Sequence, residues 1–171
     1  ALIQPEIKSF SGAEIKLLYP TEFTMGASRR EAGRRPNETL REVNLNRPFY
    51  IGVKEITNAQ FEKFNPDHSS GTTNGMSLSN QLQPVVRVTW EQAALFCNWL
   101  SDQDDLPKFY LTEAGEAGEK VVSFDLNSHG YRLPSEAEWA FSARKTNSGL
   151  LKYSWGADLP PLPQSGNFAD I

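Results

Sequence analysis

The sequence is poor in the residue types that perform thiol and metal chemistry. Its 171 residues include one cysteine, Cys97, and two histidines, His68 and His129. A single cysteine excludes a disulfide within the chain, and the sequence has neither an HExxH pattern nor a cluster of cysteine and histidine. A zinc site built by this chain alone is therefore not expected, and both histidines are predicted to lie in solvated loops.

Long apolar runs and an excess of positive charge are also lacking. No apolar run approaches the ~18–20 residues that a membrane-spanning helix needs. The formal net charge is −4 and the pI is about 5.3, so nucleic acid is not the expected partner of this surface. The composition, 39% hydrophobic and 22% charged with a mean hydropathy of −0.50, is that of a globular chain. The length fits one domain, over residues 1–171, with a real core.

Three segments carry the same signal for the start of a helix. Each begins with a hydroxyl residue and has Gln or Glu three positions later, at 57–60, 89–92 and 135–138. In this capping box the hydroxyl accepts from a backbone N–H one turn on, and the Gln or Glu side chain reaches back. The pattern predicts three helices with defined first residues.

The second of these helices, over about residues 90–101, is apolar on most sides. It is therefore expected to be buried against two neighbours. Its two stripes are Trp90, Ala93, Ala94, Cys97 and Leu100, and Phe96 with Trp99. In the third helix Trp139, Ala140 and Ala143 form one apolar stripe.

Strand-like patterns surround these helices. Alternating or near-alternating apolar residues predict strands at 14–18, 23–26, 43–53 (broken by Pro48) and 84–88. Residues 106–126 are predicted to form a hairpin, and the polar, turn-rich residues 65–83 a surface loop. Short irregular strands with a few well-capped helices indicate an α+β fold with much irregular coil.

Cys97 is the one candidate thiol nucleophile. It lies in the middle of a predicted helix, on the buried stripe. A reactive thiolate needs a helix N-terminus or a cationic neighbour. A buried structural cysteine is therefore the favoured interpretation over a catalytic one.

The charged residues offer further candidates. Arginines gather in one loop with interleaved glutamates, which favours a solvated mixed-charge loop over a phosphate or acidic-partner site. These residues are Arg29, Arg30, Arg34, Arg35, Arg41 and Arg47, with Glu31, Glu38 and Glu42. Asp102, Asp104 and Asp105 are expected to form a solvated acidic turn, since an EF-hand pattern is absent. Residues 37–39 form an N-glycosylation sequon, relevant only in a secreted eukaryotic protein.

Two roles can be proposed for Glu136 and Glu138. They could act as a paired general acid and base, or they could serve the helix start. The capping box and the helix dipole account for both carboxylates without catalysis, so the capping role is favoured.

Five segments together resemble the formylglycine-generating enzyme / sulfatase-modifying-factor family. They follow the family's order over about residues 15–168, and they are PTEFTMG (20–26), FYIGVKEITNAQF (49–61), PVVRVTWEQAALFCNWL (84–100), YRLPSEAEW (131–139) and YSWG (153–156). The resemblance implies an elaborated C-type-lectin-like fold, a twisted antiparallel sheet with flanking short helices. It also implies that the chain holds roughly the first three fifths of such a domain.

The resemblance implies limits on chemistry as well. In formylglycine generators the two copper-binding catalytic cysteines lie in a later part of the domain, and Cys97 aligns with the family's buried helix cysteine. Family members hold a structural calcium with an asparagine after the Trp-Gly region and the next backbone carbonyl. Asn167 and Phe168 match those positions and would supply half of a calcium site.

The favoured function is a non-catalytic binding or scaffold domain, or a fragment of one. The alternative is a formylglycine-generating-type copper oxidase whose catalytic cysteines lie beyond this chain. A related non-haem iron enzyme ranks last, because its metal-binding histidines are not visible here. The resemblance also favours a bacterial protein, exported rather than cytoplasmic. Apolar faces left open by an incomplete sheet would pair with another polypeptide or with a C-terminal remainder.

Overall fold

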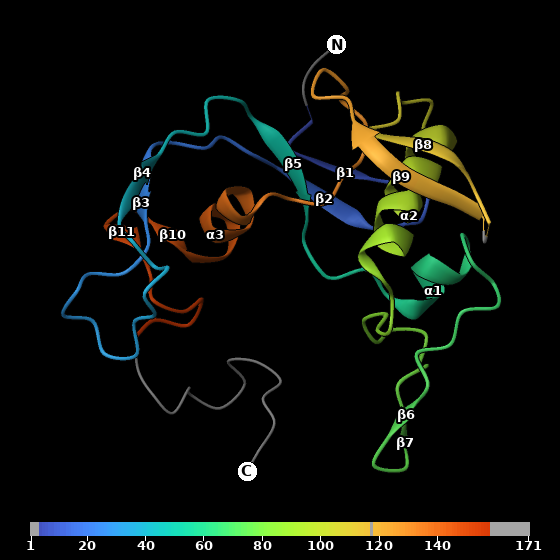
Figure 1. The fold of residues 1–171 in the computed structure, drawn as a ribbon, viewed down its shortest axis with the longest axis horizontal. Coiled ribbons are helices and arrows are strands. Elements are labelled where there is room, and N and C mark those ends of the chain that lie inside the picture. The colour runs from blue at the N-terminus through green and yellow to red at the C-terminus, as the bar shows by residue number, and fades with distance from the viewer. Residues whose placement is uncertain (1–3, 117, 158–171) are drawn as a thin grey trace. The chain divides into compact units, whose positions relative to one another are not determined.

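The computed structural model describes residues 4–116 and 118–157, and it divides the chain into two compact units (Figure 1). The first unit comprises Ala1–Leu17 and Tyr50–Leu133, and the second comprises Leu18–Phe49 and Pro134–Ile171. The fold is mixed α/β, with small sheets and few helices among the described residues. This confirms the coarse α+β prediction. In the same residues, no helix combines the length and apolarity that a membrane crossing requires.

A small antiparallel sheet opens the first unit. Its strands are β1 (Glu6–Lys8), β2 (Glu14–Leu18) and β5 (Phe49–Gly52), in the order β1-β2-β5. Ile7 pairs with Ile15, which is buried, so apolar residues at alternate positions fix the register. The predicted strand at 14–18 is confirmed.

Two helices and two hairpins complete the first unit. Helices α1 (Asn58–Glu62) and α2 (Trp90–Gln103) both begin at the predicted capping boxes, with hydroxyl and Gln side chains in place. Strands β6 (Thr72–Thr73) and β7 (Met76–Ser77) form a short hairpin at the end of a loop that extends away from α1 (Figure 1).

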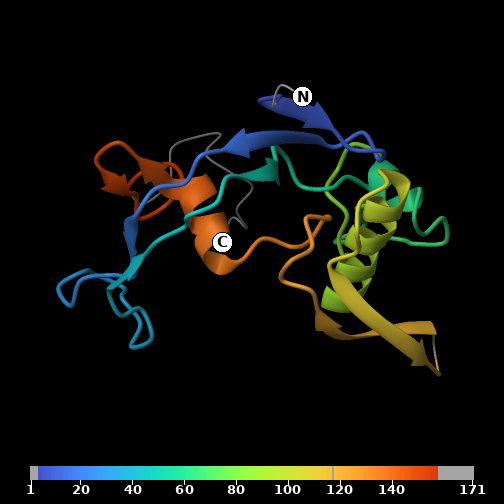
Figure 2. The same ribbon diagram turned by 90° about the horizontal axis from the view of Figure 1, so that it is seen from above.

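Helix α2 lies between two apolar clusters, as predicted, but Leu100 was expected on the stripe of Cys97 and instead belongs to the cluster of Phe96. On one face Phe96 and Leu100 pack with Phe61 of α1. On the other face Ala94 and Cys97 pack with Tyr110 of the second hairpin. That hairpin, β8 (Tyr110–Gly115) and β9 (Gly118–Phe124), lies beside α2 in both views (Figures 1 and 2) and confirms the hairpin predicted within 106–126.

The second unit has its own core. Strands β3 (Phe23–Met25) and β4 (Arg41–Val43) pair antiparallel, and α3 (Glu136–Arg144) runs into the hairpin of β10 (Lys145–Thr146) and β11 (Gly149–Leu150). Phe23, Met25 and Ala140 form the buried centre, with Phe141 and Leu150 packed against it. The third capping box is present at Ser135, so all three helix starts were predicted correctly.

Three local predictions are wrong. Residues 84–88 form no strand, because Arg87 has φ of 60°, in the left-handed region that a strand cannot contain. Trp90 is 59% exposed, although it was placed in a helix expected to be buried on two sides, and Trp139, placed on the apolar stripe of the third helix, is 56% exposed. Both tryptophans lie in the first turns of their helices, where a side chain can extend beyond the element against which the helix packs.

Candidate functional site

Cys97 lies in the middle of α2 and is buried against Ala94 and Tyr110. Burial raises the pKa of its thiol to about 12, and the nearby Arg132 charge opposes this shift only in part. At neutral pH the side chain is therefore a thiol rather than a thiolate, which is the nucleophilic and metal-binding form. Its surroundings are those of a structural cysteine, as the sequence predicted.

The polar groups around Cys97 hold the hairpin to the helix. The Asn98 amide donates to the Tyr110 carbonyl at 2.7 Å and accepts from the Tyr110 backbone N–H at 3.1 Å. The Tyr110 hydroxyl accepts from the Leu133 backbone N–H at 3.1 Å. Burial raises the pKa of the Tyr110 hydroxyl. On β9 the Val121 backbone N–H donates to Glu91 at 2.9 Å. These bonds pair polar groups of the helix with those of the hairpin and of the segment that follows it.

The acidic residues after α2 are engaged with the protein. Asp104 accepts hydrogen bonds from the Phe10 backbone N–H at 3.1 Å and from the Tyr131 hydroxyl at 2.8 Å. Burial, and then the hydrogen bond to Asp104, raise the pKa of Tyr131. Asp102 pairs with Lys108 at 2.8 Å. The prediction of a purely solvated acidic turn is therefore wrong for Asp104, which joins the N-terminal segment to Tyr131.

The two histidines differ in their surroundings. His129 is exposed, as predicted. His68 is only partly exposed. Its ring packs edge-on against the Phe61 ring, with 5.0 Å between the ring centroids, and its Nε2 lies 3.0 Å from the Val86 carbonyl oxygen. Within the described residues, no three His, Cys, Asp or Glu side chains come together as a metal site.

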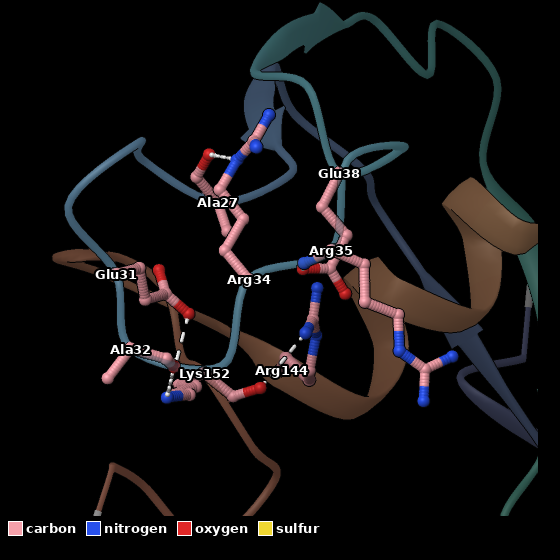
Figure 3. A network of polar contacts seen from close by, with 8 residues as sticks. All are labelled: Ala27, Glu31, Ala32, Arg34, Arg35, Glu38, Arg144 and Lys152. Atoms are coloured by element: carbon pink, nitrogen blue, oxygen red, sulfur yellow. Dashed lines mark hydrogen bonds and ion pairs between the residues drawn. The ribbon is translucent and has the colours of Figure 1, made fainter.

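The arginine-rich loop of the second unit is joined to Lys152, which follows β11: Lys152 Nζ donates to the Ala32 carbonyl at 2.8 Å (Figure 3). Arg34 Nε donates to the Ala27 carbonyl at 3.0 Å, and Arg144 donates to the Lys152 carbonyl at 3.0 Å. The guanidinium groups of Arg34 and Arg35 point in different directions (Figure 3), so they do not converge on one anion.

Two carboxylates of this loop also have partners within the protein. Glu38 accepts from the Arg35 backbone N–H at 2.8 Å, and Lys152 lies 3.9 Å from Glu31 (Figure 3). The arrangement agrees with the mixed-charge loop that the sequence predicted, rather than with a phosphate cradle.

Glu136 and Glu138 take the structural role. Glu138 accepts from the Ser135 backbone N–H at 2.8 Å and is buried, as the capping box requires. Glu136 is exposed and pairs with Arg41 at 3.0 Å. Glu138 therefore caps the start of the helix, and Glu136 forms a surface ion pair. The two carboxylates do not act together as a pair.

Residues 69–83 of the first unit, which we term the finger, are held at their base by several side-chain hydrogen bonds. The Asn58 side chain makes most of these bonds, and Asn58 is only 2% exposed. The Asn58 amide donates to the carbonyls of Leu78 at 2.9 Å, Asn80 at 2.8 Å and Gln83 at 3.3 Å, and it accepts from the Ser70 hydroxyl at 2.6 Å. One buried side chain thus fixes both ends of the finger.

A second anchor is Arg87, which lies beyond residues 84–86 that follow the finger. Its guanidinium donates to the Thr72 carbonyl at 2.9 Å and lies so close to Gly71 that a Cβ there would collide with it. At the tip, Asn74 and Gly75 have φ of 47° and 76°, the pair of left-handed residues that a tight hairpin turn requires. Hydrogen bonds thus anchor the base of the finger, and a tight turn forms its tip.

Residues 65–83 were predicted to form a surface loop, and the anchors of the finger were not predicted. Asn58 was visible only as part of the capping box, and its spacing from the finger carries no signal before the fold is known. The Asn-Gly pair at 74–75 was a readable signal for the hairpin β6–β7. Asn167 and Phe168, the predicted calcium half-site, lie outside the described residues.

Solved structures share this architecture. The chain is similar to Treponema denticola variable protein 1, with a TM-score of 0.63 and 22% identity over 89% of this chain and 60% of that chain. It is similar to CarF, with a TM-score of 0.56 and 22% identity over 81% and 64% of the two chains. It is also similar to PvdO from Pseudomonas aeruginosa, with a TM-score of 0.50 and 24% identity over 77% of this chain and 60% of that chain. At such identities the likeness shows the fold and carries no activity.

Sequence comparison adds one curated relative and a family. The chain is 32% identical over 105 residues to a protein named Chaperone protein LppX from Paenibacillus barcinonensis, which covers 56% of this chain. The chain spans about a third of that relative, 35% of its length. The model of the sulfatase-modifying factor enzyme 1-like domain matches residues 2–169, in the N-terminal part of the family domain. The chain therefore belongs to the family of sulfatase-modifying factor enzyme 1-like (FGE-sulfatase) domains.

Proposed function

We propose that this chain acts as a non-catalytic binding or scaffold domain of the sulfatase-modifying-factor family. The observation that carries the proposal is the state of Cys97. It is the one cysteine of the sequence, it is buried in α2, and its thiol has a pKa of about 12. Oxidation of a substrate cysteine through enzyme thiolates needs a reactive pair of thiols, and this side chain is neither paired nor ionised at neutral pH.

The alternative remains a formylglycine-generating-type copper oxidase completed by cysteines outside these residues. The family membership supports it, and a cysteine pair in a C-terminal continuation of the gene product would favour it. Copper would then be held by that pair. The residues of this chain would supply only the surrounding scaffold.

We place the small sheets and capped helices within a C-type-lectin-like scaffold, on the strength of the family resemblance. A calcium ion held partly by the Asn167 side chain and the Phe168 carbonyl belongs to the same proposal, since amide and carbonyl oxygens suit this ion. Calorimetric titration with Ca²⁺, with Mg²⁺ as the control ion, tests it. Heat of binding that disappears in Asn167→Ala supports the site, and equal heats in both proteins reject it.

The expected partner is another polypeptide or a C-terminal remainder of the same one. Two observations support a protein partner. The curated relative carries the name of a chaperone protein, and large apolar side chains are exposed on several elements of this chain. A net charge of −4 argues against nucleic acid.

Catalysis by the chain alone is tested with purified protein, copper, oxygen and a cysteine-containing peptide. We expect no aldehyde, detected with a hydroxylamine probe and mass spectrometry, above a control without protein. Cys97→Ser is the matched variant, because it removes the thiol and keeps the side-chain size. Aldehyde formed by the original chain and lost in Cys97→Ser would overturn the non-catalytic proposal.

A further inference from the structure

The finger differs in charge from the rest of the chain. Residues 69–83 contain no Asp, Glu, Lys or Arg, although these four types make up 22% of the sequence. The segment consists of Ser, Thr, Asn, Gln and Gly with Met76, Leu78 and Leu82. An anionic membrane or a nucleic acid would need basic residues at the contact, and the finger offers none.

The strands of the finger are very short, two residues each, but they carry neither the charges nor the prolines that help to keep exposed strands apart. Natural sheet edges carry Lys, Pro or inward-pointing charges that stop one copy from pairing with another. Strands β6 and β7 have neither charge nor proline over their length or in their turn. Met76 of β7 is 63% exposed, so apolar surface accompanies this uncharged hairpin, and Leu82 is 84% exposed nearer the base of the finger.

Such a surface is complementary to itself. Hydroxyl and carboxamide side chains each carry both donors and acceptors, so a finger can satisfy the hydrogen bonds of an identical finger. A charged surface would instead meet its own charge across a twofold axis. Asn58 and Arg87 anchor the finger by hydrogen bonds, and such anchoring lowers the conformational entropy that a loop loses on association.

We propose that the finger, residues 69–83, docks against the finger of a second copy of this chain and forms a symmetric homodimer. The contact is smaller than a standard protein interface, so the dimer is weak and exchanges rapidly. The proposal goes beyond the non-catalytic function and concerns a surface separate from Cys97, so either proposal can fail without the other.

Sedimentation velocity measures this association in the original chain. From about 10 µM to about 1 mM, the range of weak interfaces, we expect the weight-average sedimentation coefficient to rise from monomer toward dimer. Because the interface is uncharged and the copies carry like net charge, added NaCl should leave the association unchanged or strengthen it. A chain that stays monomeric throughout, or a dimer that salt dissociates, overturns the proposal.

Charge placed at the tip tests the symmetry. Met76→Glu and Met76→Lys should each remove association at every concentration, because both copies then carry the same charge. An equimolar mixture of the two variants should restore it, since opposite charges meet across the twofold axis. Loss in both variants without restoration in the mixture would mean that the opposing surface is not a second finger, and it rejects the pairing.

The matched control is Leu126→Glu, which adds the same charge at a residue 68% exposed outside the finger. It should leave the sedimentation behaviour unchanged. Circular dichroism and thermal melting check that each variant folds. If Met76→Glu does not fold, Thr73→Glu replaces it, because Thr73 is the exposed cross-strand partner of Met76. Association that persists in a folded tip variant contradicts the proposal.

Discussion

Asn58 shows how one polar side chain can organise a long loop. Its amide donates to three carbonyls and accepts from a hydroxyl at the base of the finger. Hydrogen bonds of this kind contribute modestly when they are made, but the groups left behind when one partner is removed carry a full desolvation penalty. The residue is thus more important than its weak helix propensity would suggest.

We expect Asn58→Ala to lower the free energy of unfolding by about 2–3 kcal/mol, because three carbonyls and a hydroxyl at the base of the finger each lose one hydrogen bond. Urea denaturation measures this change. Limited proteolysis should show new cleavage within residues 69–83, since the loop loses its anchor. Asn37→Ala, at an exposed asparagine, is the control and should change stability by less than about 0.5 kcal/mol. Equal effects of the two substitutions would contradict the anchoring role.

Cys97 should be almost unreactive in the folded chain. With a pKa near 12 instead of 9, the thiolate fraction at pH 8 falls by about 10³-fold, and burial blocks the reagent as well. We expect Ellman's reagent to react more than about 100-fold faster in urea than in buffer. Stability should also fall between about pH 9 and pH 12, where only the unfolded thiol ionises. Fast labelling of native protein at pH 8 would disprove the buried assignment.

At the scale of elements, the helix starts show what local chemistry can predict. All three capping boxes were readable because the hydroxyl and the Gln or Glu that form each one lie within four residues. The buried faces of α2 followed from its apolar spacing for the same reason. The hairpin at β8–β9 was marked by two strand-like runs around glycine-rich residues.

Elements fixed by distant contacts were not predictable. Residues 84–88 alternate like a strand, but the Val86 carbonyl bonds to His68, and Arg87 adopts a left-handed conformation beside the finger. Likewise, the strands predicted at 14–18 and 23–26 form, yet each pairs in a different sheet. The apolar pattern shows that a strand is present, whereas its partner depends on chain segments far away in the sequence.

The cap of α2 allows a direct test of an element's contribution. Thr89→Ala should lower the free energy of unfolding by about 1 kcal/mol, because the Gln92 backbone N–H loses its acceptor. Thr89→Ser should restore most of this loss, since serine keeps the hydroxyl. Chemical denaturation of the three proteins measures both effects. A serine variant as unstable as the alanine variant would show that the methyl group, not the cap, carries the effect.

At the scale of the whole chain, each compact unit contains its own buried cluster. Phe23, Met25 and Ala140 belong to the second unit, while the two clusters around α2 belong to the first. The family match runs through both units, from residue 2 to residue 169. One family domain therefore contains two cores, and the prediction of a single domain over 1–171 becomes a question about cooperativity.

Matched cavities in the two cores answer that question. Met25→Ala and Leu100→Ala each remove a side chain that is about equally buried, at 5% and 4% exposed, and each should cost about 2–5 kcal/mol. Because local openings follow contiguous packed regions, hydrogen exchange should increase mainly in the unit that carries the substitution. Mass spectrometry of peptides from residues 90–103 and 136–144 reports on the two units separately. If either variant raised exchange equally in both peptides, the units would open together, and the chain would behave as a single cooperative domain.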